Sequence, residues 1–310
     1  MGFQMKTTAS ACGKVILFGE HAVVYNSPAI AAPVISVHAN VSIAESEKFI
    51  LDARNYSREI NLSKEHLEKS DSLFASQETI FSTLKHFKLG KRQKIRIIID
   101  SEIPIEAGLG SGAAVAIAII RAISVHFKKK ISNNDLYDLA FKTEELHHGT
   151  PSGVDPTVII NEKPVFFKKD PKTLELLTLK NPIQLVIADT GVQSKTSEVV
   201  ADVKKNNHDE EFAEIRILTE QARDLIESGE VLRLGPLMDD NHELLKTIGV
   251  SSPELDKLVD AAREAGAIGA KLSGAGRGGH IIALADENSK AIGNALMDAG
   301  AHRVFYTEIK

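Results

Sequence analysis

The sequence has a single cysteine, Cys12, among its 310 residues, so an intrachain disulfide is excluded. It has no apolar run long enough to cross a bilayer. Its N-terminus also lacks the basic and then apolar pattern of a secretory signal. These absences predict a cytoplasmic protein that has no membrane partner.

Neither sign of charge is in large excess, because 37 Lys and Arg residues stand against 42 Asp and Glu residues. A net charge of −5 argues against a nucleic-acid partner, since proteins that bind nucleic acids usually carry a basic surface. Internal repeats and low-complexity tracts are also missing. With 43% hydrophobic and 25% charged residues, the composition is typical of a globular enzyme that acts on a small molecule.

Apolar residues recur with a period of two in some stretches and of 3.6 in others, which predicts a chain of mixed strands and helices. We expect strands at 37–43, 95–99, 184–189, 280–285 and 303–309, and helices at 113–127, 133–147, 195–205, 210–228, 236–247 and 253–265. The segment 163–182 is rich in Lys, Pro and Thr and has weak periodicity. We therefore predict a domain boundary there, with domains at 1–180 and 181–310.

Residues 103–114, IPIEAGLGSGAA, lead a glycine-rich turn directly into an apolar, helix-forming run. The first N–H groups of a helix have no acceptor within the helix, and the peptide dipoles place partial positive charge at that end. Gly108, Gly110 and Gly112 would let an anion approach the backbone closely. The pattern predicts a phosphate site, with a plain turn before a buried helix as the alternative.

A second glycine cluster, from Gly274 to Gly279, matches the dinucleotide-binding pattern G-x-G-x-x-G. That pattern must follow a strand and open a helix, whereas these glycines precede 280–285, which has the pattern of a strand. We therefore reject the dinucleotide interpretation. We expect a tight loop next to a bulky or anionic group, with a purely structural turn as the alternative.

Polar residues stand at both ends of an apolar stretch near the N-terminus, with Lys14 before it and Glu20 and His21 after it. A lysine can balance a phosphate or keep a neighbouring carboxylate ionised, and the other two side chains can hydrogen-bond a polar substrate. The alternative is a lysine that reaches the surface and a histidine that is satisfied in the core.

Two carboxylates flank a loop rich in Pro and Gly, with Glu144 on the helix before it and Asp155 at its far end. Magnesium prefers hard oxygen ligands, which Glu144 can supply. Phosphorylation of a hydroxyl benefits from a placed carboxylate that accepts the proton, which Asp155 can supply. The sequence therefore contains the components of a phosphotransferase.

Taken in order, these clusters resemble the GHMP kinase superfamily, and most closely its mevalonate kinases with short, archaeal-like chains. The resemblance covers nearly the whole chain and rests on the segments GKVILFGEHAVVY, IPIEAGLGSGAA, HHGTPSGVD, NHELLKTIGVSSPELDKLV and KLSGAGRGG. It implies an α+β fold of two domains with the active site in the cleft between them. The N-terminal, ATP-binding domain would have a mixed sheet with helices, and the C-terminal domain would be ferredoxin-like.

The same resemblance implies transfer of a phosphoryl group from ATP to the 5-hydroxyl of (R)-mevalonate in isoprenoid biosynthesis. ATP and mevalonate would be the partners, Mg²⁺ the cofactor, and a homodimer an assembly that the family allows. Asp155 matches the catalytic base and Lys14 its cationic partner, while Glu144 and Ser111 match magnesium ligands. The substrate-binding positions are matched by Glu20, His21, Thr196 and Gly276. The loop on the ATP phosphates is matched by Glu106, Ala107, Gly108, Leu109, Gly110, Ser111, Gly112 and Ala113.

Some positions depart from the family pattern. Gly112 stands where a serine usually supplies a hydroxyl to magnesium, so Ser111 or water fills that place, or Glu144 and the phosphates hold the metal. Arg277 and His280 replace smaller residues, and Arg277 either contacts an anionic substrate or covers the loop.

Two alternative functions stay open. One is a sister kinase for phosphomevalonate or another small alcohol, for which Arg277 is the only extra basic candidate. The other is a nucleotide-binding regulator without catalysis, which has no physical need for Lys14, Glu144 and Asp155 together.

Overall fold

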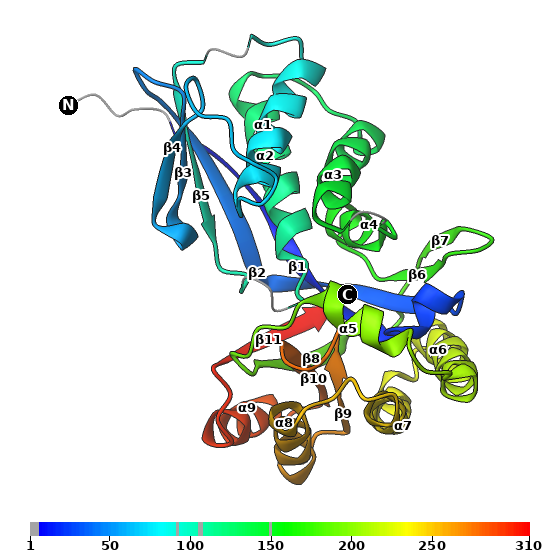
Figure 1. Ribbon diagram of the computed structural model, residues 1–310. Coiled ribbons are helices and arrows are strands. Elements are labelled where there is room, and N and C mark those ends of the chain that lie inside the picture. Colours follow the sequence, from blue (N-terminus) through cyan, green and yellow to red (C-terminus); the bar gives the residue numbers. More distant parts are fainter. Residues whose placement is uncertain (1–5, 91–92, 105–107, 149–150) are drawn as a thin grey trace. The chain divides into compact units, whose positions relative to one another are not determined.

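The computed structural model describes residues 6–90, 93–104, 108–148 and 151–310 (Figure 1). The chain forms two compact units, each built from several stretches of sequence. The first unit consists of Met1–Gly13, Val37–Pro104 and Gly110–Asn161, and the second of Lys14–Ser36, Ile105–Leu109 and Glu162–Lys310. Strands β1 (Thr7–Phe18) and β2 (Ala29–Glu45) each contribute residues to both units.

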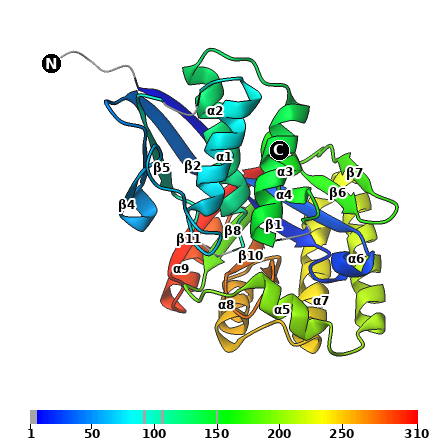
Figure 2. The ribbon, with the colours of Figure 1, turned by 45° about the horizontal axis from the view of Figure 1, so that its top comes forward.

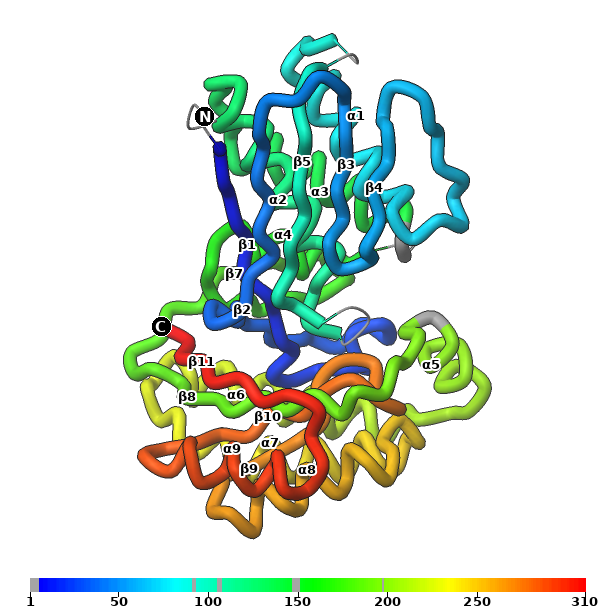
Figure 3. Tube along the Cα trace, turned by 90° about the vertical axis from the view of Figure 1, so that its left-hand side faces the viewer, coloured from blue at the N-terminus to red at the C-terminus, as the bar shows by residue number. Residues whose placement is uncertain are grey.

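The first unit combines a sheet with helices on one of its faces (Figures 1 and 3). Its strands are hydrogen-bonded in the order β4 (Arg58–Asn61), β3 (Ile50–Ala53), β5 (Ile95–Ser101) and β2, with β3 parallel to β5. The helices are α1 (Phe74–His86), α2 (Ser111–His126), α3 (Asn133–His148), α4 (Val154–Asn161) and the short 3₁₀ helix η2 (Arg54–Tyr56). Ile95, Ile97 and Ile99 alternate along β5 and are buried, which fixes the core face of this sheet.

Helix α2 lies in the interior of the first unit. Its sequence places Ala and Ile on nearly every side, and a helix without a polar face is stable only when it is surrounded by other elements. Ala114, Ile117 and Ile120 are fully buried, and α2 packs against α1, α3 and α4 (Figure 2). This packing fixes the start of α2 relative to its neighbouring helices.

The second unit contains an antiparallel sheet in the order β11 (Arg303–Ile309), β8 (Ile183–Asp189), β10 (His280–Ala285) and β9 (Gly269–Ser273). Helices α7 (Leu234–Thr247), α8 (Pro253–Glu264) and α9 (Ser289–Asp298) cover one face of this sheet (Figure 1). The end of β1 lies on the sheet as well, because the Ser273 hydroxyl accepts from the Ile16 N–H at 3.1 Å and donates to the Ile16 carbonyl at 2.8 Å.

The second unit contains further strands and helices. Strands β6 (Val165–Lys168) and β7 (Thr173–Leu176) pair with each other, and β6 pairs with the first residues of β2. The helices are η1 (Ala22–Tyr25), α5 (Thr196–Val203), α6 (Asp209–Ser228) and η3 (Val231–Arg233).

The structure confirms the predicted strands and helices to within a few residues at most ends, and it adds elements that the sequence did not reveal. Asp155 does not stand at the end of a loop, because Val154–Asn161 forms α4. Pro156 fits there because the first turn of a helix does not need its missing N–H. The segment 163–182 is also more than a linker, since it holds β6 and β7. The boundary at residue 180 stays a prediction.

The strand expected at 280–285 is β10, so the glycines before it lead into a strand and do not open a helix. Within the described residues, no helix is both long enough and apolar enough to cross a bilayer.

Candidate active site

Helix α2 begins without a side-chain cap. Its N-cap is Gly110, which has a left-handed backbone with φ of +73° and no side chain that could accept from the first turn. Ser111 and Gly112 in that turn are half-buried, and Ala113 is buried. Because the first N–H groups of a helix lack intrahelical acceptors, this start suits an external anion such as a phosphate.

Two carboxylates lie on helices that pack against α2. Glu144 is on α3 and only 5% exposed, and Asp155 is the second residue of α4 and half-buried. Both belong to the first unit, as Ser111 does. Three mutually packed helices thus supply one hydroxyl and two carboxylates.

A sharp turn at Gly153 leads into α4 and sets the position of Asp155. Gly153 has φ of +85°, which is strained for any residue with a side chain. A Cβ at this position would lie 2.2 Å from the hydroxyl oxygen of Tyr137 on α3. The Thr157 hydroxyl donates to the Gly153 carbonyl at 2.8 Å and ties the turn to α4. The placement of Asp155 therefore depends on Gly153 and Tyr137.

The second unit holds Lys14 and the last part of the glycine-rich loop. The Lys14 N–H donates to the Leu109 carbonyl at 2.9 Å, and the Lys14 side chain is buried. A Cβ at Gly108 would lie 3.4 Å from Cε1 of His280, so His280 packs against the loop. The two preceding loop positions, Glu106 and Ala107, lie outside the described residues.

Glu20 forms an ion pair with Lys271 of β9, and both side chains are fully buried. The Lys271 ammonium also donates to the Leu272 carbonyl at 2.8 Å. Burial raises the pKa of Glu20 and lowers the pKa of Lys271, while their mutual attraction opposes both shifts. The charge of Lys14 also opposes the shift of the Glu20 pKa. Oε2 of Glu20 is buried and has no hydrogen-bond partner among the described residues, so it can accept from a polar ligand.

His21 is buried against the loop that precedes β10. Its Nε2 lies 2.8 Å from the Ala275 carbonyl oxygen, and because a carbonyl only accepts, Nε2 carries the proton. Burial lowers the pKa of His21, which favours the neutral ring. Its Nδ1 is then an acceptor. The backbone of His21 has φ of +58°, an uncommon value for a residue with a side chain.

The other predicted substrate-binding residues also belong to the second unit. Gly276 has φ of +82°, and a Cβ there would lie 2.0 Å from the Val250 carbonyl oxygen. This close backbone approach requires glycine whether or not a substrate binds. Thr196 is the first residue of α5 and is exposed.

Two residues of the site were missed from the sequence, Lys271 and Tyr137. Lys271 lies in the apolar stretch that forms the fully buried strand β9, and a lysine in such a strand needs an acidic partner. That signal could have drawn attention to it. Tyr137 stacks on Phe141 one helical turn later, with ring centroids 5.7 Å apart. The pair is visible as i and i+4 on a helix, but the contact with Gly153 is not.

The donor set in the first unit fits a magnesium ion that arrives with a nucleotide. Among the described residues, no group of three or more His, Cys, Asp and Glu side chains could hold a metal ion. Mg²⁺ is usually held by one or two carboxylates together with phosphate oxygens and water. Glu144 and the Ser111 hydroxyl fit that pattern, whereas Gly112 supplies no side-chain oxygen.

Comparison with known proteins identifies the class. The sequence profile of the GHMP kinases N terminal domain matches residues 78–162, and that of the GHMP kinases C terminal domain matches residues 222–302. The chain belongs to the GHMP kinases, and the predicted α+β fold of two domains is confirmed.

Within that family, the similarity is to mevalonate kinases. The mevalonate kinase of Pyrococcus furiosus is 37% identical over 320 residues, which covers 96% of this chain and 94% of the relative. The crystal structure of the Methanococcus jannaschii mevalonate kinase has a TM-score of 0.87 and 29% identity, and covers 100% of this chain and 99% of that one. The L. major mevalonate kinase, solved in complex with R-mevalonate, has a TM-score of 0.82 and 27% identity over 100% and 99% of the two chains. This chain is a member of the mevalonate kinase family.

Proposed function

We propose that this chain transfers the γ-phosphoryl group of ATP to the 5-hydroxyl of (R)-mevalonate, as an enzyme of isoprenoid biosynthesis. The observation that carries the proposal is the similarity to mevalonate kinases over nearly the full length of the chain. The residues of the first unit support it, because α2 begins with a Gly N-cap and packs against the helices that carry Glu144 and Asp155.

Phosphoryl transfer needs alignment and charge neutralisation more than covalent chemistry by the protein. In the proposed step, the oxygen of the 5-hydroxyl bonds to the γ-phosphorus, the bond from that phosphorus to the bridging oxygen of the β-phosphate breaks, and ADP leaves. The Asp155 carboxylate accepts the hydroxyl proton. Lys14 supplies positive charge that balances the transferred group.

The nucleotide would bind at the first turn of α2, where the N–H groups of residues 111–113 point to the phosphates. Glu144 and Ser111 would hold Mg²⁺, which neutralises phosphate charge when it is bound. On the substrate side, Oε2 of Glu20 and Nδ1 of His21 can accept hydrogen bonds from hydroxyl groups. We assign Thr196 and Gly276 to the same substrate site.

The alternative of a kinase for phosphomevalonate depended on Arg277 as the extra cation for a substrate phosphate. The guanidinium of Arg277 is paired with Asp202 at 2.6 Å. We therefore favour mevalonate as the substrate. A homodimer and a domain boundary near residue 180 remain predictions of the sequence.

ADP release by the purified protein with Mg-ATP tests the proposal, with mevalonate, phosphomevalonate and galactose as separate substrates and phosphorus NMR to locate the new phosphate. We expect turnover on mevalonate that yields the 5-phosphate. Asp155→Asn should lower kcat by about 10²–10⁴-fold, as loss of a general base does, with ATP binding retained in equilibrium dialysis. Asp138→Asn, on the exposed side of α3, is the matched control. Retained activity in Asp155→Asn would refute the assignment of the base.

A further inference from the structure

We propose that Arg277 is a positioning residue that fastens α5, the helix that begins at Thr196, to the loop before β10. The inference rests on the proposed function, because Thr196 belongs to the proposed substrate site.

The loop that carries Arg277 is anchored on two sides and provides a fixed base. The Arg277 N–H donates to the Val250 carbonyl at 2.7 Å, and the neighbouring Gly276 lies against the same carbonyl. The Gly279 N–H donates to the Val192 carbonyl at 2.8 Å. The chain that leads into α5 is therefore tied to this loop four residues before the helix begins.

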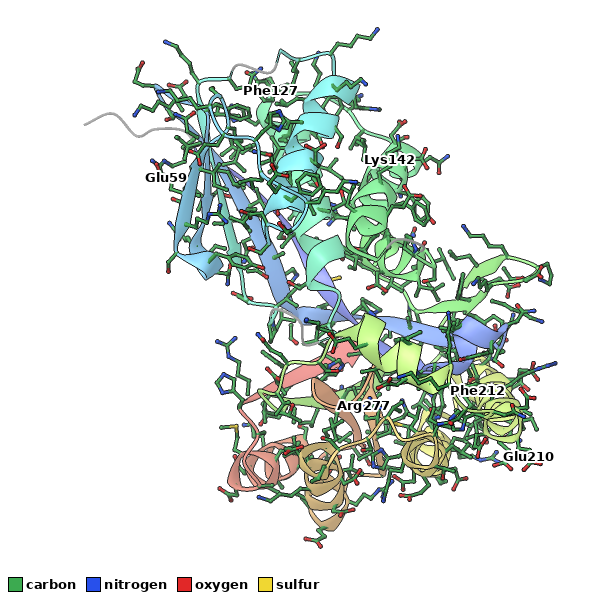
Figure 4. The ribbon with its side chains drawn as sticks, in the orientation of Figure 1. Glu59, Phe127, Lys142, Glu210, Phe212 and Arg277 are labelled. Carbon is green, nitrogen blue, oxygen red and sulfur yellow. The ribbon has the colours of Figure 1, made fainter. Side chains whose placement is uncertain are left out.

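Arg277 has a strained backbone, with φ of +55°. A glycine would adopt this conformation without strain, so the side chain must contribute something that offsets the cost. Its Nη1 donates to Oδ2 of Asp202 at 2.6 Å, and its Nε donates to the Gly249 carbonyl at 3.2 Å. Figure 4 shows Arg277 in the second unit, and Asp202 lies in the last turn of α5.

Helix α5 has the carboxylate of Asp202 in its last turn, and Arg277 is a cationic partner for it. Val199 and Val203 are buried in the core of the second unit, while Asp202, next to Val203 in the sequence, is half-buried. A carboxylate in the last turn of a helix is unfavourable, since the helix dipole is negative at that end. Lys205 binds Oδ1 of Asp202 at 2.6 Å and Arg277 binds Oδ2. The ion pair with Arg277 therefore offsets the unfavourable charge of Asp202 and links α5 to the loop before β10.

Hydrogen exchange and steady-state kinetics of Arg277→Gly test this inference. Glycine relieves the backbone strain, so the melting temperature should stay the same or rise. Amides of α5 should exchange about threefold to fivefold faster, the range expected for loss of an exposed ion pair. KM for mevalonate should rise while KM for ATP stays unchanged. Arg277→Lys should restore part of the protection, because it keeps the charge.

The control is Arg54→Gly, which removes an ion pair of similar exposure, Arg54 with Asp100 at 2.8 Å, in the first unit. It should leave α5 exchange unchanged. Equal α5 exchange in Arg277→Gly and the wild type would overturn the inference, as would an equal rise in both KM values. Hydrogen exchange does not depend on turnover, so a wild type that is inactive on mevalonate would refute the proposed function and leave the fastening to be judged by exchange alone.

Discussion

Glu20 is predicted from the sequence to bind the substrate, and in the structure it also forms a buried ion pair with Lys271. Both side chains are completely buried, so each carries the cost of leaving water and depends on the other to offset it. The pair also orients Glu20, because one carboxylate oxygen binds Lys271 and the other remains available.

Removal of Lys271 should therefore be costly. We expect Lys271→Met to lower the free energy of unfolding by about 3–5 kcal/mol, since Glu20 would be left as an uncompensated buried charge. The double variant Glu20→Leu with Lys271→Met should regain most of that loss in urea unfolding, although it should not bind mevalonate normally. Lys195→Met, which breaks the exposed pair with Glu198, should cost no more than about 1 kcal/mol. Equal losses in the single and the double variant would contradict the role of the pair.

Gly153 and Tyr137 allow a second test at the level of single residues. Gly153→Ala should be destabilised by about 1–3 kcal/mol and lose turnover, because strain and a clash with the Tyr137 hydroxyl displace Asp155. Adding Tyr137→Phe removes the clashing oxygen and leaves the nearest ring atoms at 3.4 Å, so part of the activity should return.

Gly249→Ala separates the two causes. Gly249 has φ of +78° and nothing within 4 Å of an added Cβ, so this variant has the backbone strain without the clash. It should be milder than Gly153→Ala in thermal unfolding. If Tyr137→Phe has no effect on Gly153→Ala in a double-mutant cycle, the contact does not set the turn.

At the scale of elements, we expect the first turn of α2 to influence how Mg²⁺ is held. Gly112→Ser adds a hydroxyl to this turn, and we expect it to lower the Mg²⁺ concentration needed for half-maximal turnover. Ser111→Ala should raise that concentration by about tenfold. Ser82→Ala, on α1, should leave it unchanged. If neither change in the turn alters the requirement, Glu144 and the phosphates hold the ion without Ser111.

The elements that the sequence predicted well have a strong local signal. Helix α8 has Ser252 as its N-cap, whose side chain accepts from the Leu255 N–H, and Pro253 as its first residue. Both residue types are common at these positions, so the sequence alone indicates where the helix starts. Helix α4 was missed because its proline and the preceding glycine resemble a loop, although a proline is harmless in a first turn. The hairpin of β6 and β7 was missed because its strands are short and separated by Lys and Pro.

In the candidate site too, residues in local sequence motifs were predicted, whereas pairs of residues distant in sequence were not. Motif spacing was enough to select Lys14, Glu144 and Asp155 as candidates. Ion pairs between residues distant in sequence could not be predicted, because no local pattern connects Glu20 to Lys271 or Arg277 to Asp202. Such pairs depend on the packing of the sheet and helices, which a single sequence does not display.

At the scale of the whole molecule, one buried histidine links stability to pH. Nδ1 of His242 on α7 accepts from the Leu272 N–H at 3.3 Å, and Nε2 faces Oδ1 of Asp256 at 3.3 Å. A proton on Nδ1 would set two N–H donors against each other. Burial, followed by the charge of Arg263, lowers the pKa of His242 to about 4.

Stability should therefore fall as the pH drops from 6.5 towards 4. The unfolded chain takes up the proton near 6.5 and the folded chain only near 4, so the unfolded state binds more protons in this window. The difference corresponds to about 3 kcal/mol. Urea unfolding at about pH 7 and about pH 4.5 should show a smaller loss for His242→Gln than for the wild type. His86→Gln, on an exposed position of α1, should behave as the wild type, and an equal loss in His242→Gln would exclude this histidine as the cause.

Helix α2 has no cap of its own, because Gly110 offers no side chain at the place where the phosphates of ATP are proposed to bind. A ligand that binds only the folded state stabilises it in proportion to the logarithm of its concentration. In the proposed complex, the phosphates of ATP supply the acceptors that the first N–H groups of α2 lack. Saturating ATP should therefore raise the melting temperature of the protein, and removal of ATP should lower it.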